Sequence, residues 1–102
     1  MVNELPGLAN VFHAILCDAQ KLRDKKSNWV ESGEGGTTLA WILYERQVMF
    51  NAVNQERIAR NLEPITMKEL RRAEDCATGH CDYTRKFALY CAELVIDGEV
   101  QP

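Results

Sequence analysis

The chain has 102 residues, of which 46% are hydrophobic and 26% charged, and its formal net charge is −3. This length predicts one domain spanning residues 1–102, because folded units commonly contain about 100–150 residues. The apolar content is sufficient for one modest core, which argues against intrinsic disorder. The length also excludes an enzyme built from two lobes around a cleft.

The N-terminal segment lacks the features of an export signal or a membrane span. Polar and helix-breaking residues interrupt its apolar positions, whereas a membrane helix needs about 20 nearly uninterrupted apolar residues. We therefore expect a soluble, cytoplasmic protein that does not contact a membrane. In that compartment the four cysteines are predicted to be free, buried thiols and not disulfides; they are Cys17, Cys76, Cys81 and Cys91.

Two helices are predicted in the first part of the chain. Apolar residues recur every three or four positions over residues 8–26, which is typical of one buried helix face. A second helix should begin at Thr37 or Thr38, because either side chain can cap it. It should end at Arg60 or Asn61, before the proline that follows.

Thr66 and Glu69 have the spacing of a capping box, in which each residue bonds the backbone amide of the other. A helix is therefore predicted to begin at residue 66. Two stripes, one of small and one of aromatic residues, keep helical spacing through Gly79, so one long helix over about residues 66–96 is favoured. The alternative is two helices separated by a turn at Gly79.

These elements predict an all-α protein, a small bundle of three to four helices with one long C-terminal helix. That helix would be about 46 Å long at ~1.5 Å per residue and would extend beyond a core of this size. A homo-oligomer is therefore predicted, in which a second copy covers the exposed part of the helix. The alternative is a bundle that buries both stripes within one chain. The predicted interface residues are Tyr83, Phe87, Tyr90, Cys91 and Leu94.

No metal or other cofactor is favoured, although four residues could supply a zinc site. His13 and Cys17 are four residues apart in the first predicted helix, and Cys76 and His80 are four apart in the last. If these helices pack side by side, the four side chains would form a Cys2His2 set. The chain lacks the closely spaced cysteine pairs of strong zinc signatures, so ordinary core or boundary roles are the preferred interpretation.

The segment before the second helix is a candidate ligand-binding site. Its glycine amides and two threonine hydroxyls would meet at a helix N-terminus, where the helix dipole favours an anion, and two tryptophans could stack on a base. No lysine follows the glycines, so the segment is not a P-loop. A long glycine-rich loop closed by a helix cap is the preferred interpretation, with a short hairpin within residues 28–41 as an alternative. The candidate residues are Trp29, Gly35, Gly36, Thr37, Thr38 and Trp41.

Basic residues gather around the predicted turn between the second and last helices. Acidic residues are interleaved with them, and the isoelectric point is about 5.3, so nucleic-acid binding is disfavoured. A solvated, salt-bridged surface is the preferred interpretation. These cations are nevertheless the best candidates for holding phosphate or carboxylate groups of a partner. They are Arg57, Arg60, Lys68, Arg71 and Arg72.

Catalysis finds little support in the sequence. His80, Cys81 and Asp82 are adjacent, but neighbours in a helix point about 100° apart and cannot form a working triad. The carboxylates are too few to gather several acids around Mg²⁺. We therefore predict that the protein is not an enzyme.

Residues 77–94, with the sequence ATGHCDYTRKFALYCAEL, resemble segments of small uncharacterised proteins of bacteriophages and prophages. The resemblance implies an accessory protein of the bacterial cytoplasm. Such a protein would bind a host protein, for example as an anti-host-defence factor, or sequester a small signalling ligand. The resemblance implies no catalytic residues.

The favoured function is a small oligomeric helical binding protein that acts on a host protein. The alternative is a sponge for a nucleotide or signalling molecule, with the ligand held at residues 29–41. A nucleic-acid-binding regulator is a third and weaker hypothesis.

Overall fold

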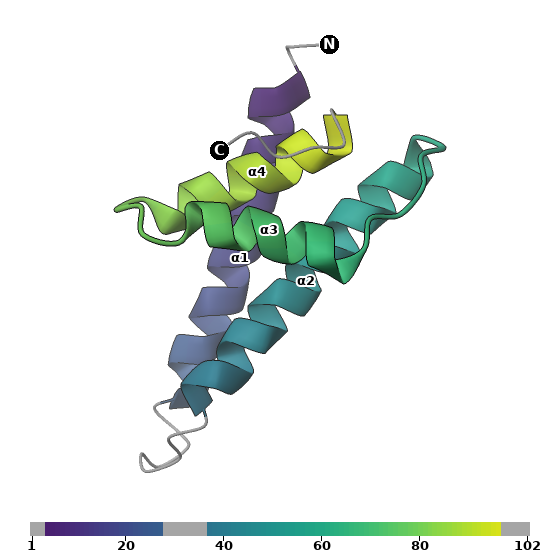
Figure 1. Cartoon of the computed structure of the whole chain (residues 1–102). Coiled ribbons are helices and arrows are strands. Elements are labelled where there is room, and N and C mark those ends of the chain that lie inside the picture. The colour runs from purple at the N-terminus through teal and green to yellow at the C-terminus, as the bar shows by residue number, and fades with distance from the viewer. Residues whose placement is uncertain (1–3, 28–36, 97–102) are drawn as a thin grey trace.

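The computed structural model describes residues 4–27 and 37–96, except for the side chains of residues 23–27 and 37–41. Within these ranges the chain forms four helices and no strand (Figure 1): α1 (Glu4–Ser27), α2 (Thr37–Ala59), α3 (Met67–Ala77) and α4 (Tyr83–Ile96). The predicted all-α bundle of three to four helices is confirmed. The hairpin alternative is wrong for residues 37–41, which are helical; residues 28–36 lie outside the described part.

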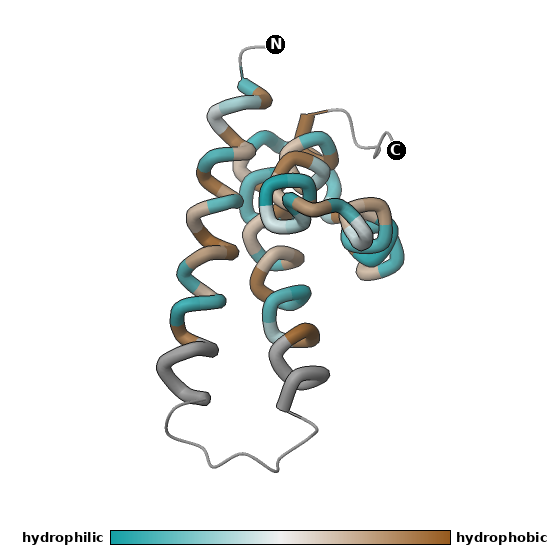
Figure 2. The backbone as a smooth tube through the Cα atoms, turned by 90° about the vertical axis from the view of Figure 1, so that its left-hand side faces the viewer, coloured by the Kyte–Doolittle hydropathy of each residue, from teal (hydrophilic) through white to brown (hydrophobic). Residues whose placement is uncertain are grey.

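Helices α1 and α2 form a long antiparallel pair, and the shorter α3 and α4 lie across it (Figures 1 and 2). Helix α4 contacts α1, α2 and α3, so it occupies the centre of the bundle. Helix α3 contacts only α2 and α4, and no Cα atom of α3 lies within 8 Å of one in α1. Helix α3 is therefore an outer element, with one face on the core and the other away from it.

The ends of α1 and α2 agree with the predictions to within a few residues. Helix α1 begins one turn earlier than expected, because Pro6 falls in the first turn, where no backbone N–H is needed for an intrahelical bond. Helix α2 ends in a Schellman motif: the Leu62 amide donates to the Arg57 carbonyl at 2.8 Å, and Asn61 has φ 65°. Asparagine tolerates this left-handed conformation better than most residues.

The predicted capping box at the start of α3 is confirmed. The Glu69 amide donates to Thr66 Oγ1 at 3.2 Å, and the Thr66 amide donates to Glu69 Oε1 at 2.9 Å. Just before it, the Asn54 side chain bonds both backbone groups of the buried Ile65, accepting from its amide at 2.7 Å and donating to its carbonyl at 3.4 Å. The start of α3 is therefore fixed both by its own cap and by α2.

The predicted single helix over residues 66–96 is wrong, and the alternative with a turn at Gly79 is confirmed. Helix α3 stops at Ala77 because Thr78 is extended, with ψ 133°, and its hydroxyl donates to the Glu74 carbonyl at 2.9 Å. Gly79 then has φ 96°, a conformation that glycine adopts without a Cβ penalty. The backbone bond from the Lys86 amide to the Asp82 carbonyl begins α4.

The break also removes the exposed half-helix that underlay the predicted oligomer interface. Phe87, Tyr90, Cys91 and Leu94 are buried in the core of a single chain, and Tyr83 is half-buried. Small residues in both helices, including Ala73, Ala77 and Ala88, permit close packing of α3 on α4. This part of the core is thus completed within one chain, as the intramolecular alternative proposed.

The centre of the core joins all four helices. It contains Phe12 and Leu16 of α1, Met49 and Val53 of α2, Leu70 of α3, and almost the whole inner surface of α4. Among the described helices, none combines the length and the apolar character needed to cross a bilayer.

Candidate functional site

The five cations predicted to contact a partner fall into two groups. Arg57 and Arg60 make contacts within the chain, whereas Lys68, Arg71 and Arg72 are exposed on α3. Arg57 donates from Nε to the Glu63 carbonyl and from Nη1 to the Leu94 carbonyl, both at 2.6 Å. It therefore ties the end of α2 to the linker before α3 and to the last turn of α4.

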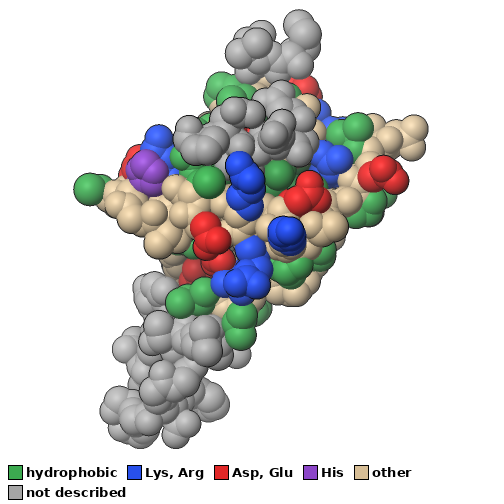
Figure 3. Space-filling model, viewed as in Figure 1, with side chains coloured by type: hydrophobic (Ala, Val, Ile, Leu, Met, Phe, Trp, Pro, Cys, Tyr) green, Lys and Arg blue, Asp and Glu red, His purple; other side chains and the backbone are tan. Residues whose placement is uncertain are grey.

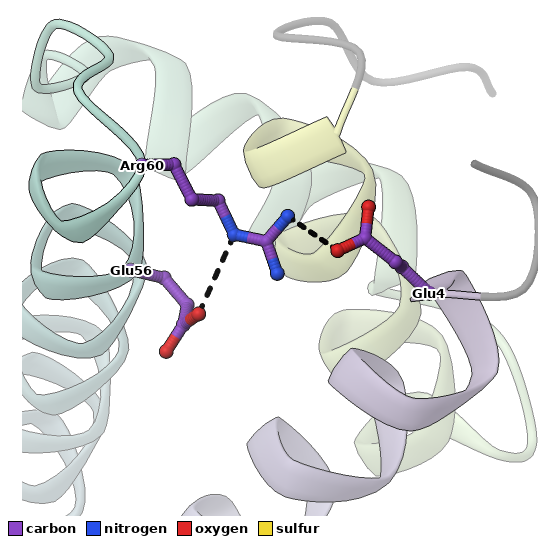
Figure 4. Close-up of polar contacts among 3 residues, drawn as sticks. All are labelled: Glu4, Glu56 and Arg60. Atoms are coloured by element: carbon purple, nitrogen blue, oxygen red, sulfur yellow. Dashed lines mark hydrogen bonds and ion pairs between the residues drawn. The ribbon is translucent and has the colours of Figure 1, made fainter.

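Arg60 joins the end of α2 to the start of α1 (Figure 4). Its Nη1 lies 2.8 Å from Glu4 Oε1, and its Nε lies 3.5 Å from Glu56 Oε1. The hydrogen bond and positive charge of Arg60 lower the pKa of Glu4, and the bond to Glu4 raises the pKa of Arg60. The charge of Arg60 is therefore compensated within the chain by these two carboxylates and is less available to a partner.

Lys68, Arg71 and Arg72 form what we call the α3 basic face. Their spacing of three and four residues places them on one side of the helix, opposite the buried Leu70 and Ala73. Lys and Arg side chains are visible over α3 in the space-filling view (Figure 3). The capping box fixes the first turn of α3, and this turn carries Lys68.

A hollow of about 430 Å³ lies along this face. Its described lining consists of the α3 basic face together with Met67 and Asp75. None of the three cations forms an ion pair or hydrogen bond with another described residue, and the nearby carboxylate of Glu69 is used in the capping box. Among the described lining, three cations and one carboxylate lie on the same side of α3, so this side of the helix has an excess of positive charge on a chain whose net charge is −3.

Beneath α3 lies a polar cluster that the sequence did not reveal as a unit. Glu74 is buried, and its Oε1 lies 2.8 Å from both Nε and Nη2 of Arg46 on α2. Glu45 of α2 is also buried. Burial, and then the charges of Glu74 and Glu45, raise the pKa of Tyr83 at the start of α4. The one sequence feature that pointed to this cluster is Arg46, a charged residue on the otherwise apolar face of α2.

The cluster has a structural role that bears on the α3 basic face. The Arg46–Glu74 pair holds the inner side of α3 to α2, and the cations project from the outer side of the same helix. Moving α3 away from α2 would leave the buried Glu74 carboxylate without its cation, which is energetically costly. Helix α3 is thus presented in a defined orientation.

The thiols differ in environment, and one expectation about them is wrong. Cys91 is fully buried, and its burial raises the pKa of the thiol. Cys81, predicted to be buried, is exposed because it falls in the turn between α3 and α4. All four cysteines are free, as predicted, but Cys17 and Cys76 are only half-buried.

The four residues of the hypothetical zinc set are not brought together. Cys17 Sγ lies 3.7 Å from His13 Nε2, but both residues belong to α1, which does not contact α3, where Cys76 lies. His80 is exposed in the turn after α3. Among the described residues, no group of three or more His, Cys, Asp or Glu side chains could hold a metal ion.

The candidate ligand-binding segment lies largely outside the described residues. Trp29, Gly35 and Gly36 are not described, and of Thr37, Thr38 and Trp41 only the helical backbone is. Helix α2 does begin at Thr37, as the sequence predicted. The ligand hypothesis for residues 29–41 therefore stays a prediction.

Comparisons with family models, with curated proteins and with solved structures gave no match for this chain. The resemblance of residues 77–94 to phage and prophage proteins accordingly stays a prediction.

Proposed function

We propose that this protein is a small helical binding protein that holds a partner protein on the α3 basic face. The observation that carries the proposal is the hollow of about 430 Å³ on the outer side of α3, where three cations have no described counter-ion. A surface on which the described cations outnumber the carboxylates is suited to recognition of an acidic partner, because complementary charges direct association and reject other partners.

The rest of the fold supports binding more than chemistry. The described polar cluster at Glu45 and Glu74 is buried beneath α3, away from the hollow, and its arginine serves to hold α3 in place. The most buried thiol, Cys91, is in an apolar setting that keeps it protonated and unreactive. The side chains that reach the hollow are groups that recognise anions, with no histidine or thiol among the described ones.

Site-specific photo-crosslinking tests the proposal in the cells that produce the protein. A photoreactive residue at Asp75, on the rim of the hollow, should give one discrete adduct with a second protein. The same residue at Gln55, an exposed position on α2, is the matched control and should not give that adduct. The adduct is identified by mass spectrometry, and the complex is then rebuilt from purified components. No adduct from Asp75, or the same products from both positions, would contradict the proposal.

Self-association is a second part of the proposed function. Its interface would be formed by residues other than those that the sequence predicted, because most of those are buried in the core. Ile42 lies on the same face of α2 as Met49, seven residues later, yet Ile42 is 41% exposed while Met49 is fully buried. Leu43 and, on α1, Leu22 are also exposed. A light-scattering mass above that of one chain, lowered by Ile42→Ser with Leu43→Ser, would support self-association through this end of the helix pair. A single-chain mass at micromolar concentration would exclude it.

The phage accessory role, including an anti-host-defence activity, is compatible with such a binding protein and stays a proposal. The nucleotide sponge and the nucleic-acid regulator also stay predictions, since no described residue favours either one. A thermal-shift panel of mono-, di- and cyclic nucleotides tests the sponge, because a ligand that binds only the folded state raises Tm. Salt-dependent binding to DNA or RNA tests the regulator.

A further inference from the structure

We propose that the α3 basic face recognises an acidic peptide segment of the partner, which carries carboxylate side chains and one apolar side chain. This inference rests on the proposed function and specifies the chemistry of the partner. It depends on three properties of the hollow: the spacing of its cations, the presence of Met67, and the position of Asp75.

The spacing of the cations suits several carboxylates close together. Lys68, Arg71 and Arg72 are neighbours on one side of α3, and side chains three or four apart on a helix have Cβ atoms about 5–6 Å from each other. A guanidinium can hold a carboxylate with two parallel hydrogen bonds, and two arginines are present. Acidic motifs are commonly recognised by arginine clusters of this kind.

Met67 adds an apolar surface to the lining of the hollow. Its side chain is half-buried and packs against the core, so it forms a fixed edge and not a freely moving chain. Methionine adapts to apolar groups of different shape, which suits contact with one aliphatic or aromatic residue of a peptide. A purely ionic ligand would leave this edge unused.

Asp75 favours a peptide over a phosphate or a nucleic acid as the ligand of this face. Its carboxylate lines the same hollow and would repel a phosphate group, which carries close to two negative charges. A peptide can place a neutral or basic residue beside Asp75 and its acids beside the cations. A nucleic acid needs a longer positive field than three cations on an acidic chain provide.

Fluorescence anisotropy with the full-length protein tests the inference. The probe is a short labelled peptide of Glu and Asp with one Leu, and its partner probe has Gln and Asn in place of the acids. The acidic peptide should bind at least about tenfold more tightly, and its binding should weaken as salt rises from about 0.05 to 0.2 M. Equal binding of the two peptides would overturn the inference, as would tighter binding of inorganic phosphate or a DNA duplex.

Charge variants locate the binding. Arg71→Glu with Arg72→Glu should weaken binding of the acidic peptide by about tenfold or more, because attraction becomes repulsion. Lys21→Glu is the matched control for the single variant Arg71→Glu, because each changes the net charge by the same amount. Lys21 is exposed on α1, which does not contact α3, so Lys21→Glu should bind like the original chain while Arg71→Glu binds more weakly. Circular dichroism confirms that each variant is folded. An equal loss in Lys21→Glu and Arg71→Glu would show that only net charge matters and would overturn the inference.

The same variants separate this inference from the proposed function. If the photo-crosslinked adduct from position 75 persists in Arg71→Glu with Arg72→Glu, the protein does bind a partner at this face, but not through acidic side chains of that partner. If the adduct never forms while the acidic peptide still binds specifically, the chemistry of the face is right and the assigned biological role is wrong.

Discussion

Arg57 near the end of α2 donates from Nη1 to the Leu94 carbonyl in the last turn of α4 at 2.6 Å. The carbonyls at the end of a helix lack intrahelical partners and form the negative end of the helix dipole. A guanidinium there donates the missing hydrogen bond and also places a positive charge against the dipole. Arg57→Ala should lower the free energy of unfolding by about 1.5–3 kcal/mol, the range for a hydrogen bond from a charged group. Urea denaturation measures this loss.

Arg85→Ala is the matched control for that measurement. Arg85 is exposed on α4 and forms no hydrogen bond or ion pair with another described residue, so its removal should change stability by less than about 0.5 kcal/mol. An equal loss in the two variants would show that Arg57 contributes through general charge and not through its bond to Leu94.

The Arg46–Glu74 pair should be far more sensitive to loss of one partner than to loss of both. Arg46→Met leaves the buried Glu74 carboxylate without its cation and should cost about 2–4 kcal/mol. The double variant with Glu74→Leu removes both charges and should recover most of that loss. Urea denaturation of the two single variants and the double variant measures the coupling. A double variant no more stable than Arg46→Met would contradict this account.

Gly79 lies in the turn that separates α3 from α4 and has φ 96°. Replacing it by alanine tests whether this turn or a continuous helix is present. Gly79→Ala should destabilise the protein by about 1–2 kcal/mol, because a Cβ disfavours this backbone conformation. Apart from its two chain neighbours, no residue has an atom within 4 Å of the added Cβ, so the cost is conformational and does not come from a clash with the rest of the fold. A continuous helix would instead gain stability from alanine, since alanine favours helix more than glycine does.

Gly7 supplies the matched control, because it lies inside α1 and a Cβ there also meets no atom within 4 Å. Gly7→Ala should stabilise the protein by about 0.5–1 kcal/mol. Thermal and urea unfolding of both variants should therefore shift in opposite directions. A shift in the same direction would mean that Gly79 is helical in solution.

The same turn shows why part of the fold was predictable and part was not. The capping box at Thr66 is a local pattern of four residues, so the sequence sufficed to place the start of α3. Periodicity could not detect the end of α3, because Ala77 and Ala88 are 11 residues apart, close to three helical turns, and both are buried. Two helices that pack on the same core keep the same phase as one continuous helix.

The candidate site was predictable only in outline for a related reason. The sequence shows five cations near one turn, but the contacts of Arg57 with the Leu94 carbonyl and of Arg60 with Glu4 join residues 37 and 56 positions apart. Likewise, nothing local pairs Arg46 with Glu74. The tertiary fold therefore determines which of the five cations are left without a counter-ion and so can contact a partner.

The thiols should react at very different rates. Cys81 is exposed in the turn before α4 and should react promptly with a thiol reagent, whereas Cys91 is fully buried and should react only when the chain unfolds. Mass spectrometry of timed labelling reactions assigns each modification. In Cys81→Ser the fast modification should disappear. Prompt labelling of Cys91 in the native protein would contradict its place in the core.

Burial of Cys91 should also make the protein less stable in alkali. Its folded-state pKa lies above the ordinary value of 9.0, because burial and then the charge of Glu74 disfavour the thiolate. Above that pH the unfolded chain loses a proton that the folded chain keeps, so the free energy of unfolding falls as pH rises. The slope from one such group is at most about 1.4 kcal/mol per pH unit. The contribution is fully present below pH 9 and is lost progressively above it.

Cys91→Ala isolates this effect from the other groups that titrate in alkali. The variant should be less stable overall, since alanine leaves a small void, but its stability should fall less steeply above pH 9 than that of the original chain. Tyr83 provides a second group of the same sign, with a pKa raised by burial and then by Glu74 and Glu45, so Tyr83→Phe should flatten the remaining slope above pH 10. Urea midpoints measured across this range test both variants. Parallel curves for the original chain and Cys91→Ala would show that the thiol ionises as easily in the folded chain as in the unfolded one, which its complete burial in the core does not allow.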